Sequence, residues 1–183
     1  QPRFLGPDDA YNTLRYNVKE IERITRIGFE SARSRRGHVT SVDKANVLEV
    51  SVLWRDVVTK MQRDEFPDVK LSHMYVDNAA MQIVLNPRQF DVILTGHLFG
   101  DILSDLGATL PGSVGVLPSA SIGGTVGVFE PVHGRAPDLA GTDMVNPIAA
   151  ILSSAMLLDY IGEREEASLV REAVSQTLET NLR

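Results

Sequence analysis

Alternating extended and helical patterns of apolar residues constrain the fold of this chain more than any other feature. Three segments rich in β-branched and apolar residues are predicted strands: 38–42, 69–76 and 90–94. Four segments with apolar residues at helical spacing are predicted helices: 17–36, 46–62, 77–85 and 97–110. This order is typical of a largely parallel α/β sheet, whose ligands bind beyond the carboxyl ends of its strands.

The two ends of the chain have a different character. Residues 1–16 are polar and contain Pro and Gly, which predicts an extended arm or loop. After the Pro111-Gly112 pair, four further elements are predicted: a strand at 126–129, an irregular loop at 130–145, and helices at 146–160 and 165–182. The chain is therefore expected to divide into two parts near residue 111.

Composition excludes several classes of protein. The chain has 183 residues, 43% of them hydrophobic, which is enough to bury a core. The absence of cysteine excludes disulfides and thiolate chemistry and favours a cytoplasmic protein. A net charge of -6 argues against a nucleic-acid partner, and Arg33, Arg35 and Arg36 at a predicted helix end fit the helix dipole better than a binding patch. No apolar run reaches the roughly 18 residues of a membrane span.

Two aspartates on one predicted helix are the first candidate metal ligands. Asp101 and Asp105 stand at positions i and i+4, so their carboxylates share a helix face. A divalent cation that prefers oxygen ligands would relieve their repulsion. A solvated polar face explains the same spacing and, from these two residues alone, is the favoured interpretation.

Two more candidates follow the predicted strands. Asp77 comes at the end of the second strand, where it could be a metal ligand or a helix N-cap. Carboxylates without competing His or Cys suit Mg²⁺ or Mn²⁺ better than Zn²⁺. Lys44 follows the first strand, where it could act as a general base or simply be a surface lysine.

Five ordered motifs decide between these alternatives. They occupy residues 39–48, 74–81, 99–105, 112–120 and 129–141. Together they resemble the isocitrate/isopropylmalate dehydrogenase family of β-decarboxylating dehydrogenases over essentially the whole chain. The resemblance implies an α/β fold with a mixed sheet flanked by helices, incomplete relative to the family. Residues 1–111 would form most of the metal-binding and dimerisation domain, and residues 112–183 the C-terminal part of the cofactor-binding domain.

The resemblance implies an NAD- and Mg²⁺- or Mn²⁺-dependent oxidative decarboxylation. The expected reaction converts 3-isopropylmalate to 2-oxoisocaproate in leucine biosynthesis. Asp77, Asp101 and Asp105 would hold the metal, and Lys44 would help take the hydroxyl proton. The site would be shared in a homodimer, with Lys44 and Asp77 reaching into the partner's site. The segments that begin at Asp77 and His97 would supply the dimer contact.

Cofactor binding is also implied by the resemblance. The Gly123–Gly127 segment is not a G-x-G-x-x-G fingerprint and precedes a strand, so the usual dinucleotide motif is absent. The family pattern assigns cofactor contacts to Asn46, Glu130, His133, Gly134, Ala136, Asp138 and Asn146. His133 would pack on adenine and Asp138 would bind the ribose hydroxyls, which favours NAD over NADP because a carboxylate repels the extra phosphate. Without the resemblance, both could be ordinary loop residues.

The match departs from the family in identifiable places. His97 stands where Asn is usual, and Arg135 where Ser is usual. The N-terminal half of the family pattern is not found, and neither is its extreme C-terminus. That N-terminal half holds the substrate-binding arginines and a catalytic tyrosine, which neither Tyr11 nor Tyr16 matches. The chain alone is therefore expected to be inactive, with a complementary N-terminal chain as a further conceivable partner. The alternatives are a sibling enzyme acting on isocitrate, homoisocitrate or tartrate, and a non-catalytic dimerising scaffold.

Overall fold

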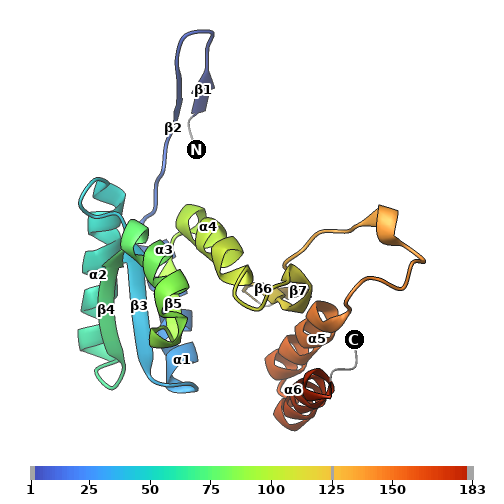
Figure 1. Ribbon diagram of the computed structural model, residues 1–183. Helices are drawn as coiled ribbons and strands as arrows, with labels where there is room; N and C mark the ends of the chain where they lie inside the picture. Colours follow the sequence, from blue (N-terminus) through green and yellow to red (C-terminus); the bar gives the residue numbers. More distant parts are fainter. Residues whose placement is uncertain (1–2, 125, 181–183) are drawn as a thin grey trace. The chain divides into compact units, whose positions relative to one another are not determined.

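The chain forms two compact units, Gln1–Gly107 and Ala108–Arg183, coloured blue to yellow-green and yellow to red in Figure 1. The computed structural model describes residues 3–124 and 126–180. Among these described residues, no helix is both long and apolar enough to cross a membrane.

A three-stranded parallel sheet forms the centre of the first unit. Its strands are β3 (His38–Asp43), β4 (Lys70–Tyr75) and β5 (Val92–Thr95), in the order β4-β3-β5. Asp43 lies opposite Tyr75, and Val42 lies opposite Thr95, so the carboxyl ends of the strands meet at one edge. The predicted parallel α/β sheet is confirmed.

Helices cover both faces of this sheet (Figure 1). They are α1 (Val18–Arg33) and α2 (Glu49–Glu65) on one face, and α3 (Val76–Leu85) and α4 (His97–Ala108) on the other. Because side chains alternate along a strand, Val39 of β3 joins the core with α1 and α2, whereas Val42 joins the core with α3 and α4. β3 is buried on both sides, which explains its run of apolar and small residues.

Local sequence signals set the ends of α1. Asn17 accepts a hydrogen bond from the backbone N of Glu20, and the Glu20 side chain accepts one from the Asn17 backbone N, which forms a capping box. After the helix, Gly37 has a φ of 72°, a conformation that glycine adopts without strain. The chain can therefore turn sharply from α1 into β3.

The N-terminal arm is a short hairpin. β1 (Arg3–Leu5) pairs with β2 (Ala10–Asn12) in antiparallel register. The rings of Phe4 and Tyr11 stack with centroids 5.9 Å apart. The sequence predicted only an extended arm or loop here, so these strands were missed.

The second unit combines a hairpin with two helices. Its elements are η2 (Val114–Val116), β6 (Pro118–Gly123), β7 (Val126–Pro131), η3 (Pro137–Leu139), α5 (Ile148–Ile161) and α6 (Arg164–Glu179). β6 pairs antiparallel with β7, α5 packs on this hairpin, and α6 packs on α5. β6 was not predicted. Residues 181–182 of the last predicted helix and Thr125 of the glycine-rich segment lie outside the described residues.

A buried aspartate joins the loops at the amino end of the sheet. The Asp91 side chain is 2% exposed and accepts hydrogen bonds from Nε of Arg35 at 3.0 Å, from the backbone N of Arg36 at 2.9 Å and from that of His38 at 3.3 Å. Burial by itself raises the pKa of Asp91, but the hydrogen bonds from these three groups outweigh it, and the pKa lies below the usual value. The ionised carboxylate therefore stabilises the fold.

Asp91→Asn is expected to lower the free energy of unfolding by about 1–3 kcal/mol at neutral pH, because it removes a buried acceptor. Since the folded-state pKa is depressed, this difference is fully present above the unfolded-state value of about 3.9 and is lost as the pH falls through the folded-state pKa. Urea denaturation of both proteins across this pH range measures it. The exposed Asp56 of α2 is the control. A constant difference down to the lowest pH would contradict the assignment.

Candidate active site

The segments that carry the predicted catalytic and metal-binding residues begin at the carboxyl edge of the parallel sheet. Lys44 directly follows β3, and Asp77 is the second residue of α3, immediately after β4. α4 begins at His97, just after β5, and carries Asp101 and Asp105. The parallel order of the strands brings all three connections to the same edge, as the sequence predicted.

Lys44 and Asp77 are in direct contact. Nζ of Lys44 donates a hydrogen bond to Oδ1 of Asp77 at 2.6 Å, and the two side chains are 27% and 65% exposed. This hydrogen bond lowers the pKa of Asp77, and the Asp77 backbone amide lowers it further. Tyr75 is the N-cap residue of α3, so Asp77 does not occupy the N-cap position that was one of its two interpretations. Lys44 is correspondingly an ion-paired residue at a strand end, and not an isolated surface lysine.

Lys44→Met is expected to raise the pKa of Asp77 toward the ordinary range of an aspartate, because the largest cause of its depression is lost. The ¹³Cγ chemical shift of Asp77 followed by NMR through an acid titration measures this change. Asp64 is a matched internal control, since its pKa is lowered by the side chain of Arg63 instead. An unchanged Asp77 titration in the variant would show that the contact with Lys44 is absent in solution.

The backbone around Lys44 is held by a network of hydrogen bonds. The backbone N of Lys44 donates to Oγ of Ser51, the backbone N of Ala45 donates to Oδ1 of Asp43, and the Lys44 carbonyl accepts from the amides of Val47 and Leu48. The Asp43 side chain is 2% exposed. These contacts orient the residue that follows β3. Asp43 and its partners were not identified from the sequence, although Asp43 is a charged residue that directly follows the predicted strand.

Asp101 and Asp105 lie on the exposed surface of α4, one helical turn apart. Residues 3–124 and 126–180 contain no group of three or more His, Cys, Asp or Glu side chains that could hold a metal ion. One copy of the chain therefore does not assemble the predicted set with Asp77, and assembly from two copies stays a prediction.

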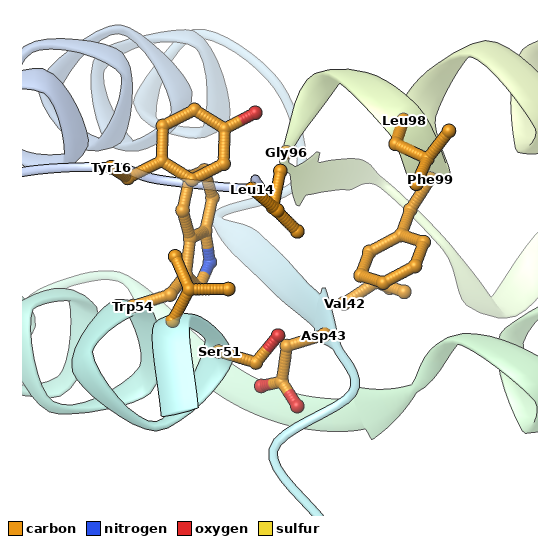
Figure 2. Close-up of a pocket in the computed structure, with 10 residues that line it drawn as sticks. Leu14, Tyr16, Val42, Asp43, Ser51, Trp54, Gly96, Leu98 and Phe99 are labelled. Carbon is orange, nitrogen blue, oxygen red and sulfur yellow. The ribbon is translucent and has the colours of Figure 1, made fainter. Parts of the chain in front are cut away.

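A small cavity adjoins the end of β3 (Figure 2). Its volume is about 20 Å³, and it is lined by Leu14, Tyr16, Val42, Asp43, Val50, Ser51, Trp54, Gly96, Leu98 and Phe99. This space accommodates about one water molecule, so it cannot receive a dicarboxylic acid. The Tyr16 hydroxyl accepts a hydrogen bond of 3.0 Å from the backbone N of His97 and so holds the first turn of α4. The cavity is part of the packing that supports the site.

The predicted cofactor residues fall in both units. Asn46 is exposed in the turn after Lys44, in the first unit. Six lie in the second unit: Glu130 in β7, His133, Gly134 and Ala136 in the following loop, Asp138 in η3, and Asn146 before α5.

Two of these residues make local contacts. His133 Nδ1 lies 2.8 Å from the Gly134 carbonyl, which orients its ring. Oδ1 of Asn146 accepts a hydrogen bond from the backbone N of Ile148, the first residue of α5. The cofactor roles of all seven residues stay predictions.

Comparison with known proteins agrees with this combination of fold and site. The sequence profile of the isocitrate/isopropylmalate dehydrogenase family matches residues 3–183, and the chain belongs to this family. It is 64% identical over 182 residues to 3-isopropylmalate dehydrogenase of Salinibacter ruber, which covers 100% of this chain and 50% of the relative. It is 60% identical over 180 residues to the 3-isopropylmalate dehydrogenase of Oleidesulfovibrio alaskensis, covering 97% and 50% of the two chains.

Solved structures show the same fold. An isocitrate dehydrogenase from Methylococcus capsulatus superposes with a TM-score of 0.89 at 40% identity, over 97% of this chain and 54% of that one. A β-decarboxylating dehydrogenase from Thermococcus kodakarensis superposes with a TM-score of 0.88 at 40% identity, over 97% and 52%. The chain thus spans about half the length of the relatives that it matches.

Proposed function

We propose that this chain contributes the Lys44 and aspartate part of the active site to an enzyme that oxidatively decarboxylates 3-isopropylmalate to 2-oxoisocaproate, with NAD and Mg²⁺ or Mn²⁺. The observation that carries this proposal is the Lys44–Asp77 contact at the carboxyl edge of a parallel sheet. The identity of 64% to a relative named 3-isopropylmalate dehydrogenase supports this substrate over isocitrate, whose named structural neighbour is 40% identical. The reaction belongs to leucine biosynthesis, for which we propose a cytoplasmic location.

The aspartates fit a hard divalent cation. Asp101 and Asp105 repel each other at i, i+4 spacing, and both are exposed on α4. Asp77 supplies a third carboxylate from the same sheet edge, and its exposed side chain is available to a second copy. Three carboxylates are a ligand set that Mg²⁺ or Mn²⁺ accepts. When bound, the cation supplies a Lewis acid for oxygens that gain negative charge, and NAD accepts the hydride.

The protein side chains have distinct tasks in this proposal. Lys44, in its neutral amine form, takes up the proton of the substrate hydroxyl at Nζ and becomes the ammonium, and Asp77 orients that amine through the 2.6 Å hydrogen bond. The buried contacts of Asp43 keep the Lys44 backbone in place. In the second unit, His133 packs on the adenine and Asp138 accepts hydrogen bonds from the ribose hydroxyls, which selects NAD over NADP.

The exposed apolar surface of α3 and α4 supports a homodimer with shared sites. Five apolar side chains on these helices are each more than half exposed: Met81, Val84, Leu85, Leu98 and Ile102. Exposed apolar side chains gathered on neighbouring elements are typical of an interaction surface. A second copy packed there would bring the Asp77 of one chain toward the Asp101 and Asp105 of the other.

The proposal is tested with a chimera in which this chain replaces the half of the Salinibacter ruber relative that it matches. Reduction of NAD by 3-isopropylmalate and Mn²⁺, followed by absorbance, is expected for the chimera and not for the 183-residue chain by itself. Lys44→Met in the chimera should lower turnover by about 10²–10⁴-fold, the usual contribution of acid–base catalysis. A folded chimera that turns over isocitrate or tartrate but not isopropylmalate would contradict the substrate, and one without any turnover would contradict the activity.

A further inference from the structure

A partly buried arginine–aspartate pair includes Asp43, the residue that precedes Lys44. From α2, Arg55 donates hydrogen bonds from Nε to Oδ2 of Asp43 at 2.9 Å and from Nη2 to Oδ1 at 2.8 Å. This two-point geometry fixes both carboxylate oxygens relative to the guanidinium plane. The Asp43 side chain is 2% exposed and that of Arg55 30%, so this pair is more shielded from solvent than the other ion pairs among the described residues.

The same guanidinium also contacts the neighbouring strand. It lies over the ring of Tyr75, with Cζ 5.1 Å from the ring centroid, in a cation–π contact. Asp43 and Tyr75 are the last residues of β3 and β4, and they are paired in the parallel register. Arg55 therefore joins the carboxyl ends of the two adjacent strands.

Each of these strand ends leads directly to a functional residue. Lys44 follows Asp43, and the amide of Ala45, on its other side, donates to Oδ1 of Asp43 at 2.9 Å. On the second strand, two peptide bonds separate Tyr75 from Asp77. A shift of either strand end would move one partner of the Lys44–Asp77 hydrogen bond relative to the other.

Stability alone does not explain a charged pair at this position. A buried ion pair often stabilises a fold no more than apolar residues of the same volume, because both charges lose their hydration. Its two-point geometry, in contrast, fixes orientation more strictly than apolar packing does. The adjacent core contains Trp54, Val57 and Val58, so α2 already packs on the sheet through apolar contacts.

We propose that Arg55 is a positioning residue, which clamps Asp43 and Tyr75 and thereby holds Lys44 and Asp77 at the geometry needed in the active site. This inference rests on the proposed function, because it concerns the placement of the proposed base and of one proposed metal ligand. Arg55 touches neither substrate nor cation and acts only through Asp43 and Tyr75.

The test compares Arg55→Gln with a matched variant at the opposite end of the same sheet. Arg35→Gln removes one hydrogen bond to Asp91, whose side chain is also 2% exposed and which lies at the amino end of the sheet, far from the carboxyl edge. Mn²⁺ affinity is measured by titration calorimetry, stability by urea denaturation, and the distance between Lys44 Nζ and Asp77 Oδ1 by crystallography. Arg55→Lys keeps the charge without the two-point geometry. The double variant Asp43→Asn/Arg55→Gln avoids an unpaired buried charge if the single variant does not fold.

Arg55→Gln, or the double variant, should weaken Mn²⁺ binding by about 10–100-fold, as does the loss of groups that orient metal ligands. The Lys44–Asp77 distance should exceed hydrogen-bond range in its crystals. Arg55→Lys should recover part of the affinity, and Arg35→Gln should lose stability with its Mn²⁺ affinity unchanged.

Wild-type affinity in Arg55→Gln, or an equal loss of affinity in Arg35→Gln, would overturn the inference. If the unmodified chain does not bind Mn²⁺, the proposed function fails. In that case the Lys44–Asp77 distance in the Arg55 variant alone decides the inference, and an unchanged distance refutes it.

Discussion

Asp105→Asn is expected to weaken Mn²⁺ binding by about a hundredfold or more, since even the loss of a group that merely orients a metal ligand costs about 10–100-fold. Asparagine keeps one carbonyl oxygen but removes the negative charge that a hard divalent cation favours. The substitution also removes the repulsion between Asp101 and Asp105. The fold should therefore be unchanged or stabilised by a few tenths of a kcal/mol. Titration calorimetry with Mn²⁺ and urea denaturation measure the two effects separately.

Asp56→Asn is the matched control for this variant. Asp56 is an exposed helical aspartate in the same unit, on α2 instead of α4. Its replacement should leave the Mn²⁺ affinity unchanged. If Asp105→Asn binds Mn²⁺ as tightly as the unmodified chain, Asp105 is not a ligand and the solvated-face interpretation of the aspartate pair is correct.

Phe29→Ala is expected to have the largest effect on stability. Phe29 is completely buried in the core between the sheet and helices α1 and α2, and its ring stacks on Phe66 with centroids 5.0 Å apart. Removing this ring leaves a cavity that the packed surroundings fill only partly, which costs about 3–5 kcal/mol. Trp54 belongs to the same core and is the single tryptophan of the chain, so its fluorescence reports unfolding of the first unit.

Phe4→Ala provides the comparison, because the Phe4 side chain lies in the N-terminal hairpin and is 48% exposed. Its effect on the same fluorescence transition should stay within about 0.5 kcal/mol. Cavity formation predicts that Phe29→Ala lowers the free energy of unfolding by several kcal/mol. A decrease below about 1 kcal/mol would show that the core between α1, α2 and the sheet is not packed as described.

The central sheet could be predicted from the sequence because its strands are buried and apolar and alternate with amphipathic helices. The missed strands have neither property. β1 and β2 have three residues each and are exposed, and β6 contains Pro, Ser and Gly in place of a β-branched run. Such strands form because a neighbouring strand supplies hydrogen bonds, and local residue preference does not reveal that pairing.

The candidate site, like the strands, was predictable only in part. Lys44 and Asp77 could be placed at one edge because parallel strands end together, and their contact follows from that topology. The clamp formed by Asp43, Arg55 and Tyr75 could not be predicted, because its members come from three elements and meet only after α2 has packed on the sheet. Asp43 did carry a detectable signal, since it directly follows the predicted strand 38–42, and a carboxylate that is buried at a strand end requires a partner.

The most direct test of the shared metal site is a mixture of two variants that each bind Mn²⁺ poorly. Asp77→Asn and Asp105→Asn chains are each expected to lose Mn²⁺ binding, because every site in either homodimer lacks one carboxylate. In a mixed dimer, however, one site combines the intact Asp77 of one chain with the intact Asp105 of the other. Equal amounts that exchange freely should therefore regain about a quarter of the wild-type Mn²⁺ sites, as expected for random two-fold pairing. If the mixture binds no more Mn²⁺ than the separate variants, the site is not built from two copies.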